Sequence, residues 1–455
     1  MSISRRRLVH SLGAGVLGAG ALSACGEGVP RGRRGRRRTT TTAPTADALS
    51  EPDQPLVLGS IGASYGRSAP FEHAIAIGIS ESLIDVNHRF NGLFGQDVQL
   101  FDRHVMTEAG EDLSGVIDEM AGSGVTAVIT SIDEDALIAA IPAFVEAGIA
   151  VIDLFTSGMN VRATDVISSG MLVRLSPTTR TLAAMYAEAS WSDTGSDRTG
   201  APGTVAFLSE DTSHGHDLLH ELEQLLGPAG GKLVSEEFYP FGELDDIEAR
   251  VETILETPPA LLVANGGPEV APLLSALHEA TLDEGQRPTV EIPVRLGPAA
   301  SVDYVEADLA PEALVRATGF EPGAEIERRH ENMMLNVDPQ LRSTGYAYSQ
   351  HAYDALMLAA LAAQQSLSVQ GTDIAATIPG VLTGTEECTD FGQCVTILRD
   401  AVVAGDRATI SFTGRMGPLE LDAAPDPRSG QLRTYSWTEA GAIVDDGADS
   451  FEAPD

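Results

Sequence analysis

The sequence predicts an α/β protein made of two doubly wound lobes, each with a mainly parallel β-sheet and helices on both faces. Two observations support this fold class. First, short apolar runs alternate with segments of helical periodicity over residues 56–155, and the alternation repeats over 204–266. Such alternation is typical of parallel strands joined by helical crossovers. Second, the polar stretch 190–203 separates the two series, which favours two lobes over one continuous sheet.

The individual elements follow from their apolar periodicity. The runs rich in Val, Ile and Leu are short enough for buried strands, and the segments between them have the spacing of one apolar helix face. The expected strands are 56–62, 97–103, 125–130, 149–155, 204–210, 232–239 and 260–266. The expected helices are 71–90, 113–120, 136–147, 217–226, 245–255 and 346–365, and strand-like segments at 417–422 and 432–437 close the chain.

The N-terminal segment has the features of an export signal. Three arginines at positions 5–7 precede an apolar run over 12–24, which is shorter than the roughly 20 residues needed to cross a bilayer. The segment therefore predicts a cleaved signal over 1–24, and its start resembles a twin-arginine signal. The sequence LSAC ending at Cys25 resembles the bacterial lipobox, whose cysteine is lipidated. We expect a lipid anchor on the extracytoplasmic face of the cell membrane; a plain secretory signal is the alternative.

Residues 25–55 are expected to form a disordered tether behind this anchor. They contain six arginines and no apolar periodicity, so they cannot bury enough surface to offset the entropy of ordering. Arginines beside a lipid anchor favour anionic headgroups. Of the 29 basic residues, nine precede residue 39. Of the 66 acidic residues, 65 follow it, so the body has a charge of about −45. This charge repels polyanions, so no nucleic-acid partner is expected.

Cys388 and Cys394 are expected to form a disulfide. The chain has three cysteines, and Cys25 is assigned to the anchor. Outside the cytoplasm a lone pair ordinarily forms a disulfide, which here closes the small loop ECTDFGQC. A zinc site is the weaker alternative, because no companion ligands lie nearby in the sequence.

Five short motifs occur in a fixed order along the chain. They are Asp85-Val-Asn87 with the glycines up to 95, the strand 148–152 followed by Thr156-Ser157, LSEDTSHG at 208–215, Tyr353-Asp354-Ala355, and GPLELD at 417–422. Their order and spacing resemble the type 1 periplasmic binding proteins, specifically the leucine/isoleucine/valine-binding branch of ABC-transporter receptors. The resemblance covers about residues 56–437, nearly the whole body.

The resemblance implies two Rossmann-like lobes joined by a three-stranded hinge, with a ligand cleft between them. Open α/β sheets bind ligands at the carboxyl ends of their strands. With crossings near residues 176, 318 and 413, the expected parts are a first lobe of 56–176 plus 319–412, a second lobe of 177–318 plus 413–440, and a flexible acidic tail over 441–455. The implied partners are a small polar solute and ABC permease subunits. We expect a monomer without cofactors.

The resemblance also implies candidate ligand-binding residues, each with a simpler alternative. Thr156 and Ser157 lie where the family binds a ligand carboxylate, although they could cap a turn. Glu243 matches a family glutamate that meets the ligand ammonium, although it could be solvated. Phe71, or alternatively Tyr65, lies near the position of an aromatic residue in the first-lobe loop, although either could belong to the core.

Two departures from the family pattern concern the ligand. Where amino-acid binders place serines on the ligand carboxylate, this chain has Ser131 followed by the acidic run from Asp133 to Asp135. These acids would repel a carboxylate and favour a cationic or polyol-like ligand, or they stabilise the N-terminus of the next helix. The family tyrosine of the second lobe is here His214. We therefore include Ser131, Asp133 and His214 among the candidates.

Metal binding and catalysis are the remaining functional classes. His214, His216 and His220, with Glu210 nearby, have a spacing compatible with metal ligands, but no second cluster supports a metal site and none is expected. The motifs of hydrolases, P-loop proteins, zinc proteases and dinucleotide-binding enzymes are missing from the sequence. No enzymatic activity is expected.

The sequence thus predicts a solute-binding lipoprotein that captures a small polar ligand, such as an amino acid or amide, between two lobes for ABC-type import. The alternative is a sensory or regulatory lipoprotein of the same fold that acts on a partner protein and transports nothing. The sequence does not distinguish the two, because docking surfaces have no motif.

Overall fold

The computed structural model describes residues 49–192 and 200–454. The expected signal, Cys25 and most of the tether lie outside these residues. The end of the expected tether contacts the first lobe, because the side-chain amide of Gln364 donates to Glu51 at 3.1 Å. Arg399 lies 3.8 Å from the same carboxylate. The folded body therefore begins a few residues before its first strand.

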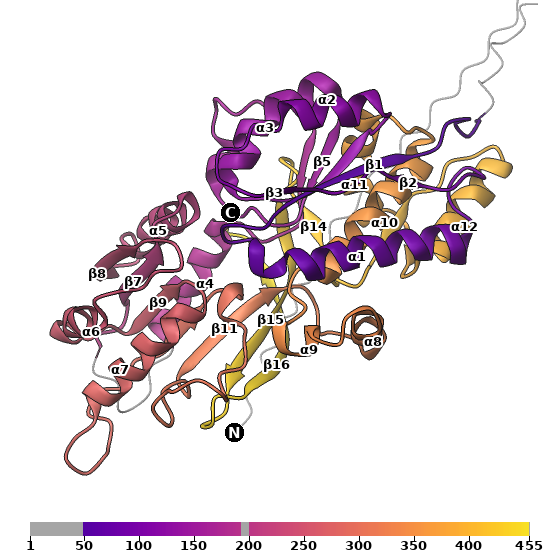
Figure 1. Cartoon of the computed structure of the whole chain (residues 1–455). Coiled ribbons are helices and arrows are strands. Elements are labelled where there is room, and N and C mark those ends of the chain that lie inside the picture. The colour runs from indigo at the N-terminus through magenta and orange to yellow at the C-terminus, as the bar shows by residue number, and fades with distance from the viewer. Residues whose placement is uncertain (1–48, 193–199, 455) are drawn as a thin grey trace, which may run out of the picture. The chain divides into compact units, whose positions relative to one another are not determined.

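The first lobe is built on a parallel sheet with the strand order β2-β1-β4-β5-β6, and β3 also pairs with β1 (Figure 1). The apolar runs predicted as strands form β1, β2, β4 and β5, although the segment 97–103 keeps only two paired residues; β3 and β6 were not predicted. Its strands are β1 (Val57–Ala63), β2 (Gln99–Leu100), β3 (His104–Met106), β4 (Ala127–Ser131), β5 (Ala150–Asp153) and β6 (Leu172–Arg174).

Helices cover both faces of this sheet. One face packs on α2 (Ser114–Gly122) and α3 (Glu134–Ala147). The other packs on α1 (Glu72–Ile84), α10 (Ser349–Ser366), α11 (Gly371–Leu382) and α12 (Phe391–Val403), so the late helices return to the lobe that begins the chain (Figure 1). Every side chain from Ser349 to Gln364 is buried, because α10 lies between the sheet and the neighbouring helices. A Cβ at Gly78 of α1 would lie 2.6 Å from the Ser349 carbonyl, so this glycine permits the close α1–α10 approach.

The second lobe has a larger, mixed sheet with the order β14-β15-β11-β10-β9-β7-β8 and β16 paired with β15. The strands from β7 to β11 are parallel, and β14, β15 and β16 are antiparallel. The strands are β7 (Thr204–Glu210), β8 (Lys232–Tyr239), β9 (Leu261–Asn265), β10 (Val294–Leu296), β11 (Ala317–Pro322), β14 (Glu420–Leu421), β15 (Pro427–Trp437) and β16 (Ile443–Glu452). Its helices are α4 (Thr179–Ser192) and α5 (Ser213–Leu226) on one face, and α6 (Ile247–Glu256) and α7 (Ala271–Thr281) on the other.

The chain passes between the lobes three times in the described residues. The passages lie between β6 and α4, between β11 and α8 (Arg328–Val337), and between β13 (Ile410–Phe412) and β14. Thr318 itself is paired within β11 of the second sheet, so the second passage follows residue 322 rather than residue 318. A short helix, α9 (Leu341–Thr344), precedes α10.

A buried charge cluster fastens the turn between β14 and β15 to the first lobe. Asp426, just before β15, accepts hydrogen bonds from Arg174 at 2.7 Å through both carboxylate oxygens. Arg162 donates to the same carboxylate at 2.7 Å. The two arginines hold the pKa of Asp426 below its usual range although burial alone would raise it. This cluster joins the hinge to the loop that follows β5.

The expectation of a flexible acidic tail over 441–455 is wrong. Most of this segment forms β16, which pairs with β15 from Ile443 to Glu452. The strand lies at the edge of the sheet with most of its side chains exposed, so acidic residues are tolerated there and the apolar alternation of a strand is missing. Phe451 is the buried exception and packs beside Gly430.

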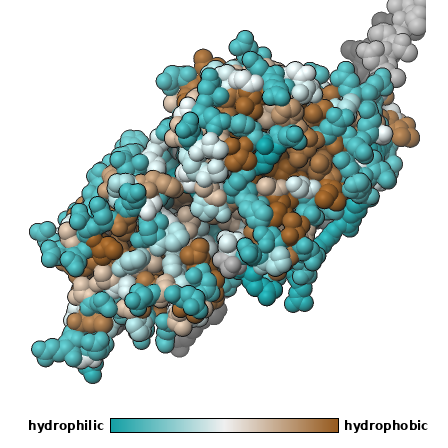
Figure 2. Space-filling view, in the orientation of Figure 1, coloured by the Kyte–Doolittle hydropathy of each residue, from teal (hydrophilic) through white to brown (hydrophobic). Residues whose placement is uncertain are grey.

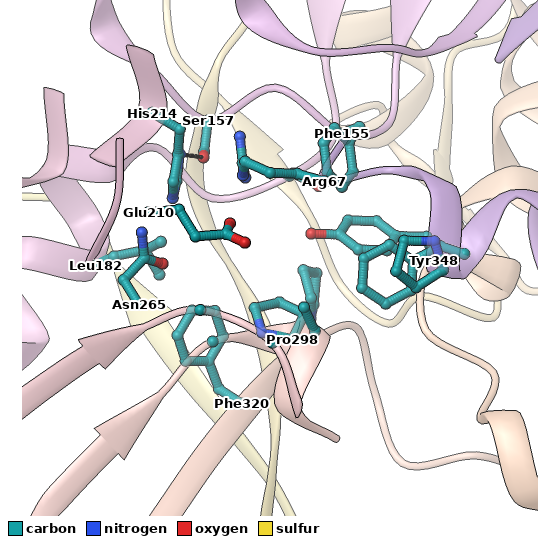
Figure 3. Close-up of a pocket in the computed structure, with 18 of the residues that line it drawn as sticks. Arg67, Phe155, Ser157, Leu182, Glu210, His214, Asn265, Pro298, Phe320 and Tyr348 are labelled. Atoms are coloured by element: carbon teal, nitrogen blue, oxygen red, sulfur yellow. Dashed lines mark hydrogen bonds between the residues drawn. The ribbon is translucent and has the colours of Figure 1, made fainter. Parts of the chain in front are cut away.

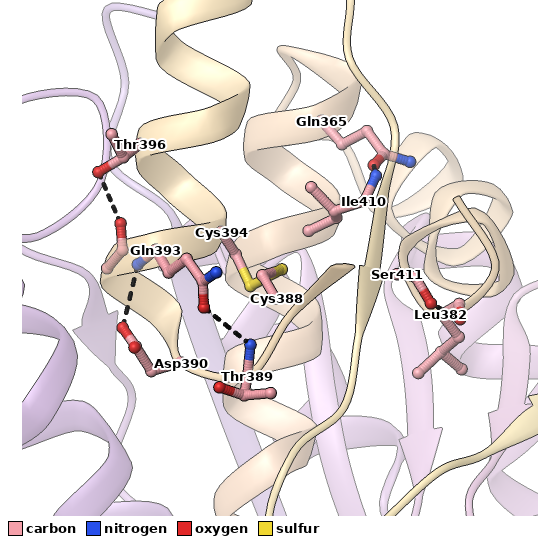
Figure 4. The surroundings of a disulfide bond; sticks show 11 residues. Gln365, Leu382, Cys388, Thr389, Asp390, Gln393, Cys394, Thr396, Ile410 and Ser411 are labelled. Carbon is pink, nitrogen blue, oxygen red and sulfur yellow. Dashed lines mark hydrogen bonds between the residues drawn. A yellow bond between two sulfur atoms is a disulfide. The ribbon is translucent and has the colours of Figure 1, made fainter. Parts of the chain in front are cut away.

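Cys388 and Cys394 form a disulfide between β12 (Glu386–Cys388) and the first turn of α12 (Figure 4). Their Cα atoms lie 5.4 Å apart, within the range that disulfides require. Asp390 caps α12 by accepting from the backbone N–H of Gln393 at 3.0 Å, which turns the chain back between the two cysteines. Both sulfur atoms belong to the core of the first lobe.

The face of the protein drawn in Figure 2 is covered largely by hydrophilic residues, with hydrophobic residues between them. This agrees with the net charge of −37. Within the described part of the chain, no helix has both the length and the apolar character that a membrane span requires.

Candidate ligand-binding site

A cavity of about 230 Å³ lies where the carboxyl ends of strands from both sheets meet. The loops after β1 and β5 line it from the first lobe, and those after β7, β8, β9 and β10 line it from the second. Open α/β sheets place their ligand sites at these strand ends because the loops there converge. The hinge contributes Ser176 and Pro177, so the cavity has walls on both lobes and a floor between them.

Aromatic rings form much of the first-lobe wall. Phe71, Phe155 and Tyr348 pack against one another with ring centroids 4.9 to 6.1 Å apart. The hydroxyl of Tyr348 points into the cavity (Figure 3), and no described residue hydrogen bonds to it. Phe241 and Phe320 line the opposite side. These rings offer an apolar surface that suits the body of a small organic molecule.

Behind the first-lobe wall, the buried Glu134, at the first turn of α3, binds the polar groups of the lining residues Arg67 and Ser157. One carboxylate oxygen accepts the backbone N–H groups of Ser157 and Gly158, both at 3.2 Å. The other accepts from the Arg67 guanidinium at 2.9 Å. Burial by itself would raise the pKa of Glu134, but the charge of Arg67 and the contact with His214 outweigh it and hold the pKa well below its usual range. Glu134 is therefore ionised and fully paired.

Arg67 extends from the loop after β1 towards the centre of the cavity (Figure 3). Its guanidinium carbon lies 4.9 Å from the Phe155 ring centroid, and Asp133 lies 3.9 Å from the guanidinium. Burial raises the pKa of Asp133 to about 6, although Arg67 opposes the shift. The charge of Arg67 is thus balanced by acids of its own lobe.

The second-lobe wall carries two carboxylates that are only partly paired. Glu210, at the end of β7, accepts the backbone N–H of Gly242 at 3.1 Å, and Glu269 accepts from Tyr239 at 2.8 Å and from Gly267 at 2.7 Å. In both residues these bonds use one oxygen, and no described residue hydrogen bonds to the other. Burial, reinforced by the charge of Glu269, raises the pKa of Glu210 to about 7.

His214 connects the two walls. Its Nδ1 atom hydrogen bonds to the hydroxyl of Ser157 at 3.0 Å and lies 3.5 Å from Glu134. Burial and the charge of Arg67 lower the pKa of His214 against the opposing effect of Glu134, so the ring is neutral near pH 7. The backbone N–H of Met159 also donates to Asp217 across the lobes, at 2.7 Å.

The structure brings some of the predicted site residues to the cavity and leaves others away from it. Phe71, Ser157 and His214 line the cavity, whereas Tyr65, Ser131, Asp133, Thr156 and Glu243 are not among the lining residues. Tyr65 packs on the first-lobe core, and Ser131 accepts from Arg103 at 2.9 Å. Thr156 donates twice to the buried Asp153, and Glu243 is exposed.

The sequence interpretation missed Arg67, Glu210, Asn265, Glu269 and Tyr348 as cavity residues. Most of them share a position signal: Glu210 and Asn265 lie at the ends of predicted strands, and Arg67 and Glu269 lie in the loops after them, where parallel sheets bind ligands. Tyr348 lies at the N-terminus of a helix far along the sequence and offers no such signal.

The histidines that suggested a metal site separate in the structure. His216 is exposed, bonds to Asp211 at 2.8 Å and stacks on Phe238. His220 is exposed, and His214 faces the cavity. Among the described residues, no group of three or more His, Cys, Asp or Glu side chains is placed to hold a metal ion.

Two α/β lobes, three passages between them and a cavity at the facing strand ends define a type 1 periplasmic binding protein. A family model described as periplasmic binding protein matches residues 120–392, and the chain belongs to this family. The resemblance drawn from the motifs is thereby confirmed. A comparison with curated proteins gave no match.

Solved structures with the same fold include the branched-chain amino acid transporter substrate-binding protein LivJ from Streptococcus pneumoniae in complex with isoleucine. It has a TM-score of 0.61 and 13% identity over 88% of this chain and 100% of that one. The leucine-binding protein LivK from Thermotoga maritima has a TM-score of 0.61 and 14% identity over 86% and 98%. A solute-binding protein from R. palustris in complex with benzoate has a TM-score of 0.59 and 13% identity over 88% and 98%. At these identities the likeness is one of fold.

Proposed function

We propose that this chain is an extracytoplasmic solute-binding lipoprotein that captures a small polar solute, of the size of an amino acid or amide, and delivers it to an ABC permease. The observation that carries the proposal is the cavity itself, which combines aromatic walls with polar groups from both lobes. Membership of a family of binding proteins favours capture over catalysis.

Capture follows from differential contact with the two lobes. A solute held against Phe155 and Tyr348 of the first lobe reaches Glu210 and Asn265 of the second only when the lobes are close together. The solute therefore binds the closed arrangement more tightly and shifts the population towards it. The hydrogen bond between Ser157 and His214 crosses the same gap and contributes to that arrangement.

A thermal-shift screen of amino acids, amides, polyamines and sugars tests the proposal. A solute at 100 times its Kd raises the free energy of unfolding by about 2.7 kcal/mol, which is a clear shift of the melting temperature. Uptake of the identified solute should fall in cells that lack the protein. A screen in which no solute shifts the melting curve would contradict solute binding, and normal uptake without the protein would favour a sensory role.

Membrane attachment through Cys25 is a separate part of the proposal, supported by the LSAC sequence and the preceding apolar run. Cys25→Ser in the full chain should release the protein from the membrane fraction, because the thiol is the site of lipidation. Cys388→Ser is the matched control and should remain membrane-bound. Retention of Cys25→Ser in the membrane would exclude the anchor.

A further inference from the structure

The hydrogen-bond donors on the first-lobe wall are already occupied by a carboxylate of the protein. Glu134 takes the backbone N–H groups of Ser157 and Gly158 and the guanidinium of Arg67, and it is 1% exposed. A solute carboxylate at this loop would find these donors engaged and would meet the charge of Glu134. Burying it there without partners is strongly unfavourable. The remaining N–H groups of Arg67 can still donate to a neutral oxygen.

The second-lobe wall lacks a positively charged partner for its carboxylates. Glu210 is 7% exposed, its carboxylate points into the cavity (Figure 3), and one of its oxygens has no hydrogen-bond donor among the described residues. Glu269 lines the same wall, and the charges of the two acids repel each other. The positive charge in the cavity, Arg67, is balanced by Glu134 and Asp133 on the other side. A buried carboxylate without a counter-charge is costly, so this wall lacks a cation.

The apolar lining fits a cation with an organic body. Phe71, Phe155 and Tyr348 present ring surface on one side, and Phe241 and Phe320 present it on the other. Aromatic faces attract ammonium groups and also bury hydrocarbon. A strongly hydrated inorganic cation would leave this surface unused.

We infer that the solute is an organic amine with an apolar or aromatic body and no carboxylate group. Its ammonium group binds Glu210 and Glu269, its body packs on the aromatic wall, and Glu134 fills the position that a solute carboxylate would otherwise take. This inference rests on the proposed function and specifies its substrate class.

A matched set of three compounds tests it. Phenethylamine carries the amine, 3-phenylpropanoate carries the carboxylate, and phenylalanine carries both groups on the same body. A second set of 3-methylbutylamine, 4-methylpentanoate and leucine provides a smaller body. Calorimetric titration of the full chain should give binding for the amines at least about tenfold tighter than for the matching amino acids, and none for the carboxylates.

Three variants assign the roles. Glu210→Gln should weaken amine binding by about 10- to 100-fold, because it removes a charge-assisted hydrogen bond. Glu134→Gln keeps an oxygen for the backbone N–H groups but frees the charge of Arg67, so binding of phenylalanine relative to phenethylamine should rise about tenfold or more. Glu236→Gln, exposed on β8, is the matched control and should bind as the wild type does. Circular dichroism checks that each variant is folded.

The results separate the substrate class from the function. Tighter binding of an amino acid or carboxylate than of its amine would overturn the inference and leave solute binding intact. Binding of none of the six compounds, while another solute shifts the melting curve in the wider screen, would also overturn it. If Glu210→Gln binds the amines as tightly as the wild type does, Glu210 does not bind the ammonium group. This conclusion does not depend on whether Glu134→Gln folds.

Discussion

The two walls of the cavity differ in how their charges are paired. On the first-lobe wall, Glu134 and Arg67 bind each other, and Glu134 also holds two backbone N–H groups. On the second-lobe wall, Glu210 and Glu269 each use one oxygen within the protein, and no described residue hydrogen bonds to the other. The first wall is complete without a solute, and the second is not.

This difference separates two tasks that a binding site must perform. A fully paired wall is rigid and gives the cavity its shape, whereas an unpaired wall supplies the energy that distinguishes one solute from another. On our proposal, the same residue type, glutamate, serves stability on one side and recognition on the other. The difference predicts that mutations on the two walls have different consequences.

The largest expected effect is on the stability of the folded protein. Glu134→Ala should lower the free energy of unfolding by about 3–5 kcal/mol, because it leaves the buried Arg67 without its main partner. Glu210→Ala should lower it by no more than about 1 kcal/mol or should raise it, since the substitution removes a buried carboxylate that Glu269 repels. Urea denaturation without solute at pH 8 measures both. Equal losses in the two variants would break the distinction between the walls.

The next effect is on pH dependence. The pKa of Glu210 is about 7 in the folded protein and about 4.3 in an unfolded chain, so between these values the folded state binds more protons. Stability without solute should therefore fall as pH rises from 5.5 to 8. Amine binding requires ionised Glu210 and should strengthen by up to about 30-fold over the same range.

The groups that face Glu210 act in known directions over this range. Glu269 and Asp133 raise its pKa and Arg67 lowers it, while His214 is neutral above its own lowered pKa. Calorimetry and urea denaturation at several pH values measure the two trends. Affinity and stability that rise together with pH would show that Glu210 is not the group that titrates.

The smallest expected effect is at the acid that the family resemblance selected. Glu243→Gln should alter solute affinity by less than about twofold, because Glu243 is exposed and outside the cavity lining and exposed charges interact weakly. Parallel titrations of Glu243→Gln and Glu210→Gln with the same solute measure the contrast. A larger loss in Glu243→Gln would restore the sequence assignment and move the ammonium site to the loop after β8.

Most of the fold could be predicted because buried strands and amphipathic helices leave strong periodic signals. The runs that became β4, β7 and β9 are almost wholly buried, and their composition alone identified them. The strand β16 left no such signal, since one buried residue, Phe451, gives no alternation. The second passage was placed too early, because β11 continues past Thr318 to the turn signal Pro322-Gly323, which the sequence interpretation did not use.

The site could be predicted only in outline. Sequence reasoning placed ligand contacts at strand ends, and Ser157 and His214 are indeed there. It also noticed the acids from 133 to 135, but it could not show that the Glu134 side chain turns inward to bind Arg67 from a loop 67 residues earlier. Side-chain packing between distant segments decides which of several neighbouring acids points inward. That packing cannot be read from a single sequence.

The C-terminal edge strand has a practical consequence for anyone who produces this protein. Because it is acidic, this segment resembles a dispensable extension that can be removed. Truncation before residue 441 would expose backbone N–H and C=O groups of β15 that β16 now pairs. A bare strand edge is a template for association with other chains. A shortened version should therefore be prone to precipitate, and affinity tags should be joined after β16 rather than in place of it.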